Sequence, residues 1–300
     1  MVCDFQIQWY PGHMAKARRE LLQQVKQVDF VVEVADARAP ESTRNPEIDQ
    51  LIKGRPRLLL LTKADLAEPG VLASWVQAFR RRGVETVAAS LLDGRDAAAL
   101  RGLLRSWVER ESTSKRLKRA AFAEIPGVRM PRSTQKTLVR GLVVGIPNTG
   151  KSTLIRAIGG KGVRVGAKAG VTRGLQWVNA GEGVQLLDTP GLLWPRLETG
   201  LTALKLAWLG CVGDAAFDHE EAALRLVEWF LERDPGVLAQ RYELVPASFS
   251  SPRDALSAIA KSRGLLLSGG EPDLLQAAEA LLWDLRRGRL GLLGLDGPAH

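Results

Sequence analysis

Apolar and polar positions follow two different patterns in the first half of the chain. Short apolar runs predict buried strands at 30–36, 58–61, 85–89 and 142–144. Longer mixed segments between them predict helices at 15–27, 46–53, 70–82 and 96–111. Because strands alternate with helices, we expect an α/β domain with a mostly parallel sheet and helices on both of its faces.

The pattern changes towards the end of the chain. Two more strands are expected at 175–179 and 183–187, but strand-like runs disappear from Thr199 onward. Three amphipathic segments then predict helices at 220–232, 253–263 and 273–287. We therefore expect an α/β domain over residues 1–196 and a small all-helical domain over residues 197–300.

Charge is distributed unevenly between these two parts. Residues 1–196 contain 32 Lys and Arg against 18 Asp and Glu, whereas residues 197–300 contain 10 against 15. The basic excess favours a polyanionic partner such as RNA, and a merely solubilising surface is the alternative. The excess is densest at 112–138, where Pro126 and Pro131 break regular structure, so we expect a basic linker that contacts RNA phosphate or is simply solvated.

Other compositional features narrow the class of protein. Two cysteines, Cys3 and Cys211, are too few for a disulfide framework or a cysteine zinc site. The chain starts without the basic and apolar segments of a signal peptide, and no apolar run reaches the ~18 residues of a membrane span. We expect a cytoplasmic protein that does not enter a membrane and is monomeric when free.

Residues 145–152 carry the most specific chemical motif. They read Gly-Ile-Pro-Asn-Thr-Gly-Lys-Ser and fit the phosphate-loop pattern G-x-x-x-x-G-K-S/T between a predicted strand and a predicted helix. The glycines let backbone N–H groups point at phosphate oxygens, Lys151 reaches the β- and γ-phosphates, and Ser152 can ligate Mg²⁺. The alternative is a glycine-rich turn that happens to contain Lys-Ser. We expect a nucleotide site that includes Asn148, Thr149, Gly150, Lys151, Ser152 and Thr153.

Two downstream features match the rest of a nucleotide-hydrolysing site. Asp188-Thr-Pro-Gly191 fits D-x-x-G, whose Asp supports Mg²⁺ and whose Gly N–H meets the γ-phosphate. Thr172 lies between this motif and the phosphate loop, where a switch threonine would close over the metal. We expect Ser152, Thr172 and Asp188 to hold the Mg²⁺, with Lys151 and Thr172 contributing to catalysis.

An upstream motif indicates which base is bound. Thr62-Lys-Ala-Asp65 resembles the N/T-K-x-D guanine reader, in which the Asp carboxylate accepts from guanine N1–H and the 2-amino group, and the Lys stem packs over the base. Ser90 follows the next predicted strand, at the position that closes a guanine pocket. Each short motif is weak alone, but together at strand ends they predict a GTP/GDP site that includes Thr62, Lys63, Asp65, Ser90 and Gly191.

The order of these motifs is that of a known group. The base reader precedes the phosphate loop, an order that resembles the circularly permuted GTPases. Residues 36–46 are similar to that group's D-A-R-x-P-x-S-x-x-N-P signature. Together with residues 9–17, 261–264 and 268–270, they make essentially the whole chain resemble the ribosome biogenesis GTPase A (YlqF) family.

That resemblance implies a GTPase that assembles the large (50S) ribosomal subunit through rRNA contacts, with the helical domain contributing to ribosome binding. It also assigns roles at the site. Leu192 stands where many GTPases place a water-orienting Gln, so hydrolysis should be slow alone, and the resemblance implies that His13 orients the water. Asn148 is implied to help bind K⁺, while a helix-capping His13 and a turn-forming Asn148 remain alternatives.

Two other functions stay open from the residues alone. A nucleotide-gated RNA-binding switch that does not hydrolyse GTP is compatible with Leu192. An ATP-using enzyme of another phosphate-loop class would require Asp65 to be accidental, and competition between GTP and ATP would test it.

Overall fold

The computed structural model describes residues 5–7, 12–52, 54–123, 139–159, 176–180, 184–189, 191, 200–245 and 250–299. Its centre is a six-stranded sheet in the order β3-β2-β1-β4-β6-β5. The strands are β1 Phe30–Asp36, β2 Arg57–Thr62, β3 Glu85–Ala89, β4 Val139–Val144, β5 Gln176–Asn179 and β6 Val184–Asp188. All neighbouring strands pair in parallel except β5, which pairs antiparallel with β6 at the sheet's edge.

Helices cover both faces of this sheet, and the described parts confirm the expected α/β fold. On one face, α4 (Gly94–Ala123) and α5 (Lys151–Gly159) bury Trp107 and Ile155 against Phe30. On the other, α1 (Gly12–Val25) and α2 (Ile48–Ile52) cover β1, β4 and β6, while α3 (Pro69–Arg81) covers β1 and β2. The all-apolar strands predicted from the sequence are apolar because both faces are covered.

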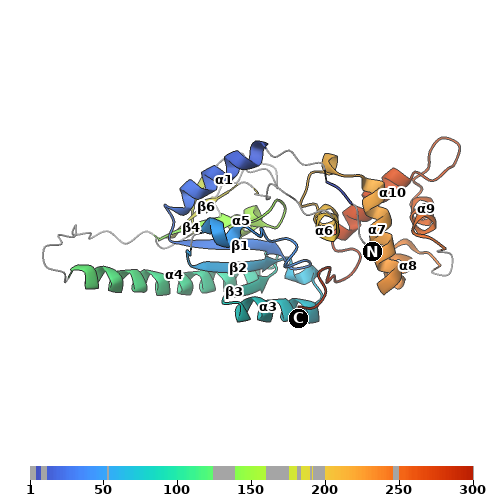
Figure 1. The fold of residues 1–300 in the computed structure, drawn as a ribbon. Coiled ribbons are helices and arrows are strands. Elements are labelled where there is room, and N and C mark those ends of the chain that lie inside the picture. Colours follow the sequence, from blue (N-terminus) through green and yellow to red (C-terminus); the bar gives the residue numbers. More distant parts are fainter. Residues whose placement is uncertain are drawn as a thin grey trace.

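The helical part of the chain has its own apolar core. It comprises α6 (Leu201–Trp208), α7 (His219–Arg233), α8 (Gly236–Tyr242), α9 (Pro252–Ser262) and α10 (Leu274–Arg286). Three of these helices begin with a side-chain cap: Asp218, Ser251 and Asp273 each accept from a backbone N–H three residues on. Figure 1 shows these helices on one side of the molecule and the sheet on the other.

Both ends of the chain cross between the two parts. Phe5 is buried in the core of the helical part, and Ile146 of the phosphate loop packs against the same core. After α10, the chain returns to the sheet domain and ends near α3 (Figure 1). There Leu293 exchanges backbone hydrogen bonds with Leu66 and Glu68, and the carbonyl of Gly297 accepts from Nε1 of Trp75 on α3. The boundary near residue 197 stays a proposal, because residues 192–199 lie outside the described residues.

Three differences from the sequence expectation concern regular structure. Helix α4 runs 30 residues to Ala123, so residues 112–123 are helical where an irregular basic linker was expected, and 124–138 lie outside the described residues. Helices α6 and α8 were not predicted as separate elements.

No described helix is both long enough and apolar enough to cross a membrane.

Candidate nucleotide site

The predicted nucleotide motifs meet at the carboxyl ends of the parallel strands. The register pairs Asp36 with Thr62 across β1 and β2, Thr62 with Ala89 across β2 and β3, and Val143 with Asp188 across β4 and β6. Because these strands are parallel, their carboxyl ends lie together. The base-reader loop, the loop of Ser90, the phosphate loop and Asp188 therefore all lie at the edge where open α/β sheets bind ligands.

The phosphate loop needs its glycines for space. A Cβ on Gly145 would lie 2.4 Å from the carbonyl oxygen of Val34, and one on Gly150 would lie 3.1 Å from Oγ1 of Thr62. Gly150 also has a φ of 101°, which side chains rarely adopt. Inside the loop, Oγ1 of Thr149 donates to the carbonyl of Ile146. The loop is thus packed closely against β1 and β2 and then enters α5, whose N-terminal N–H groups suit phosphate.

Lys151 is buried at the start of α5. Its Nζ donates to the carbonyl of Ile146 at 2.7 Å, the arrangement of a lysine folded back over its own loop. Burial lowers the pKa of Lys151 to about 8, and the carboxylate of Asp188 opposes that shift. An anionic phosphate beside Nζ would add a further charge that favours the ammonium form.

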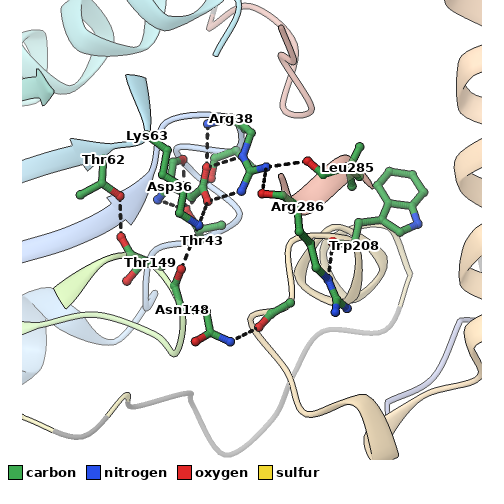
Figure 2. A network of polar contacts seen from close by, with 12 residues as sticks. Asp36, Arg38, Thr43, Thr62, Lys63, Asn148, Thr149, Trp208, Leu285 and Arg286 are labelled. Atoms are coloured by element: carbon green, nitrogen blue, oxygen red, sulfur yellow. Dashed lines mark hydrogen bonds and ion pairs between the residues drawn. The ribbon is translucent and has the colours of Figure 1, made fainter. Parts of the chain in front are cut away.

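The base-reader loop is bonded directly to the phosphate loop. The hydroxyl of Thr62 donates to the carbonyl of Thr149, and Nζ of Lys63 donates to the carbonyl of Asn148 at 2.9 Å (Figure 2). The N/T-K-x-D motif allows Asn or Thr at this position. Here Thr62 makes the hydrogen bond between the two loops, from a side chain shorter than that of Asn. Asp65 follows in the short helix η1 (Ala64–Leu66), and the backbone N–H of Ser90 donates to Asp96 at 2.8 Å.

The oxygen atoms that this site offers can be compared with those that a magnesium ion requires. Asp188 is a buried carboxylate at the end of β6, and Ser152 is the second residue of α5. Among the described residues, no group of three or more His, Cys, Asp or Glu could hold a metal. One carboxylate and one hydroxyl fit Mg²⁺, which takes few protein oxygens and completes its shell with phosphates and water.

The remaining predicted site residues are placed only in part. Gly191 is exposed, and a Cβ there would lie 2.7 Å from the backbone nitrogen of Pro147 in the phosphate loop. Thr153 lies on the first turn of α5. His13 belongs to α1, of which this part is described by its backbone alone, and Thr172 and Leu192 lie outside the described residues.

A cavity of about 480 Å³ opens beside the two loops. The loops line it with Lys63 and Asn148, and the helical part lines it with Leu209, Gly210, Val212, Gly213, Asp214, Trp283, Arg286 and Arg287. Nδ2 of Asn148 donates across to the carbonyl of Gly210 at 2.6 Å. The helical part therefore forms one wall beside the candidate site.

Comparison with known proteins decides the family. A family model described as 50S ribosome-binding GTPase matches residues 140–232. Ribosome biogenesis GTPase A from Bacillus licheniformis is 37% identical over 295 residues, which cover 97% of this chain and 98% of that protein. This chain belongs to the ribosome biogenesis GTPase A family.

Other members of the family match nearly the whole chain. The ribosome biogenesis GTPase A of Thermotoga maritima is 31% identical over 97% of this chain and 94% of its own length. A crystal structure of GNP-bound YlqF from T. maritima matches with a TM-score of 0.61 at 26% identity, covering 92% of this chain and 95% of that one. The circularly permuted GTPase fold expected from the motif order is thereby confirmed.

Two buried charged residues of this family member were not assigned a role from the sequence. Asp36 and Arg38 were noted only as part of the D-A-R signature, yet both are fully buried beside Lys63. Burial alone would raise the pKa of Asp36, but the charges of Arg38 and Lys63 hold it well below its usual range. A charged residue at the end of a strand that is apolar apart from Glu33 was the available signal.

Proposed function

We propose that this protein binds and hydrolyses GTP and acts as an assembly factor for the large ribosomal subunit. The observation that carries the proposal is the hydrogen bond from Nζ of Lys63 to the carbonyl of Asn148, because it joins the base reader to the phosphate loop. A guanine nucleotide must touch both loops at once. Membership of the ribosome biogenesis GTPase A family supplies the reaction and the ribosomal context.

The base would be selected by Asp65. Its carboxylate would accept from guanine N1–H and the 2-amino group, which adenine does not offer. The stem of Lys63 would pack over the base, and the loop of Ser90 would close the pocket. This preference for guanine is what separates the proposal from an ATP-using enzyme.

The phosphates would bind at the start of α5. The backbone of Asn148, Thr149 and Gly150 would point N–H groups at phosphate oxygens, and Lys151 would lie against the β- and γ-phosphates. Ser152 and Asp188 would hold Mg²⁺, with Thr172 closing over it and the N–H of Gly191 meeting the γ-phosphate. The ion supplies neutralisation of the charge that develops on the transferring phosphoryl group.

Hydrolysis needs a group that orients water. Leu192 has no polar side-chain atom, so turnover of the protein alone should be slow. We assign that role to His13, brought within hydrogen-bond reach when a ribosomal subunit docks. Nδ2 of Asn148 is turned towards Gly210, so its Oδ1 is the atom that would ligate K⁺ near the phosphates.

The ribosomal partner fits the charge of the protein. The net positive charge of residues 1–196 suits rRNA phosphates, whereas the helical part is acidic overall and offers only local basic groups such as Arg287 and Arg289. A monomeric state and a cytoplasmic location stay expectations.

The alternative is a nucleotide-gated RNA-binding switch without hydrolysis, with which Leu192 is compatible. Steady-state GTP hydrolysis, measured in potassium buffer with and without purified large subunits, separates the two. We expect the subunits to stimulate turnover by at least ~10-fold and His13→Ala to abolish the stimulation while GDP binding is retained, because one general catalyst contributes about 10²–10⁴-fold.

Further measurements serve as controls for this comparison. Gln23→Ala replaces an exposed residue of the same helix and should leave stimulation intact. Sodium in place of potassium should lower turnover if Asn148 helps hold K⁺. Equal, unstimulated turnover of wild type and His13→Ala would contradict the role of His13 and favour the switch, and effective competition by ATP would contradict guanine selection.

A further inference from the structure

A fully buried carboxylate lies directly behind the base reader. Oδ2 of Asp36 accepts from Nζ of Lys63 at 2.7 Å and from Nη2 of Arg38 at 2.8 Å, and Oδ1 accepts from the backbone N–H and Nε of Arg38 (Figure 2). The spacing D-A-R allows this, because a guanidinium two residues on can fold back and grip both oxygens. One carboxylate thus faces two cations inside the protein.

Lys63 needs such a partner to keep its position. It has a φ of 58°, a left-handed conformation that costs a non-glycine residue energy and persists only where its surroundings hold it. Its ammonium is held between the carboxylate of Asp36 and the carbonyl of Asn148. The backbone of Asn148 is also left-handed, with a φ of 59°. The position of the lysine stem over the base is therefore set by Asp36 as well as by the phosphate loop.

Arg38 carries the same cluster into the helical part. Its Nη1 donates to the carbonyl of Leu285 at 3.0 Å and to that of Arg286 at 3.5 Å, at the C-terminal end of α10. The carbonyl of Leu285 also accepts from the backbone N–H of Gly288 in the turn after the helix, and a cation at this end complements the helix dipole. Arg286 in turn donates to the carbonyls of Ala207 and Trp208 at the end of α6.

The geometry points to Asp36 and Arg38 as positioning residues for guanine-nucleotide binding: Asp36 holds the stem of Lys63 in place over the base, and Arg38 makes that placement depend on the docking of α10. The inference rests on the proposed GTP site and names how the helical part acts on it. The two residues do not touch the nucleotide. They are the polar path from the base reader to the ends of α10 and α6.

The test compares binding of a fluorescent GDP, N-methylanthraniloyl-GDP, to wild type and to Asp36→Asn. The substitution keeps the shape of the side chain and removes its charge. We expect the Kd for GDP to rise about tenfold or more, because one partner of a buried charge pair has lost the other. Hydrogen exchange should also accelerate together at residues 62–66 and at the end of α10.

Glu33→Gln is the matched control. Glu33 is a second buried carboxylate on β1, paired with Arg44 and Arg57 but not with Lys63. Glu33→Gln should lower stability about as much as Asp36→Asn does and leave the Kd for GDP within about twofold of wild type. Lys63→Met keeps the stem, and Asp36→Asn added to it should raise Kd no further if Asp36 acts through Lys63.

Three results would overturn the inference: an unchanged Kd in Asp36→Asn, an equal increase in Glu33→Gln, or full additivity with Lys63→Met. If Asp36→Asn does not fold, Arg38→Lys replaces it, since Lys keeps the charge but lacks the fork that reaches both Asp36 and Leu285. Wild-type Kd and wild-type exchange at α10 in Arg38→Lys would overturn it equally. Failure of the wild-type protein to bind GDP would instead remove the proposed function on which the inference rests.

Discussion

Burial sets the charge of the phosphate-loop lysine. Lys151 is 6% exposed, and removal of its ammonium from water lowers its pKa to about 8. The free protein near pH 8 therefore contains both protonated and neutral Lys151. Phosphate binds the protonated form, so binding and protonation are linked.

We expect GDP binding at pH 8 to take up about half a proton at Lys151, because a group at its pKa is half protonated and a bound phosphate drives it to the charged form. Uptake should fall towards zero by pH 6, where Lys151 is already charged, and the affinity for GDP should weaken above pH 8. Calorimetry in two buffers with different ionisation enthalpies measures the uptake directly.

Lys151→Arg provides the control, since a guanidinium stays charged at all these pH values. Whatever its affinity, this variant should bind GDP without the proton uptake seen at pH 8. Wild-type binding that takes up no proton at pH 8 would show that Lys151 is fully charged in the free protein, contrary to this expectation.

At the scale of secondary-structure elements, what the sequence predicts depends on how each element is packed. β1 was predicted because all seven of its residues are buried, which makes the run continuously apolar apart from Glu33 and Asp36. Helix α6 was missed because residues 203–208 are all buried, so it lacks the polar face that marks an amphipathic helix. Residues 112–123 lack apolar periodicity, and Lys- and Arg-rich sequence does not separate a helix from a solvated loop.

The sequence likewise predicts some contacts of the candidate site and misses others. Motif spacing predicted that Lys63 and the phosphate loop would meet, because both follow parallel strands. It could not predict that Arg38 would reach the carbonyl of Leu285, a contact between residues 247 positions apart. Such a contact depends on how α10 packs, which no local pattern encodes.

Two glycines on different elements test the packing of the sheet. Gly141 lies on β4, where an added Cβ would lie 2.3 Å from the ring of Phe30 and 2.7 Å from Leu186. Gly102 lies on the exposed side of α4 with nothing within 4 Å of the same added atom. Both changes to Ala reduce the freedom of the unfolded chain alike, so their difference reports the available space.

We expect Gly141→Ala to lower the free energy of unfolding by about 1–3 kcal/mol through overpacking. Gly102→Ala should raise it by roughly 0.5–1 kcal/mol, because Ala favours the helix. Urea denaturation followed by far-UV circular dichroism measures both. A Gly141→Ala protein as stable as Gly102→Ala would show that β4 has room that this packing does not provide.

At the scale of the whole molecule, the permuted order places the helical part directly after the D-x-x-G motif, and the final segment then brings the chain back to the sheet. The return is fixed by Asp296, whose carboxylate accepts from the backbone N–H groups of Glu41 and Ser42, from the hydroxyl of Ser42 and from Nζ of Lys205 on α6. One side chain thus joins the loop after β1, the first helix of the helical part and the end of the chain.

This junction gives the last prediction. Both members of the pair are largely buried, with side-chain exposures of 4% for Asp296 and 10% for Lys205. Asp296→Ala should lower the free energy of unfolding by about 3 kcal/mol, because it leaves the ammonium of Lys205 buried without this carboxylate. Adding Lys205→Met should recover part of that loss, since the charge is removed and the apolar stem is kept. Destabilisation in the double variant equal to the sum of the two single changes would mean that Lys205 and Asp296 do not stabilise each other, and this pair would then contribute little to holding the two parts together.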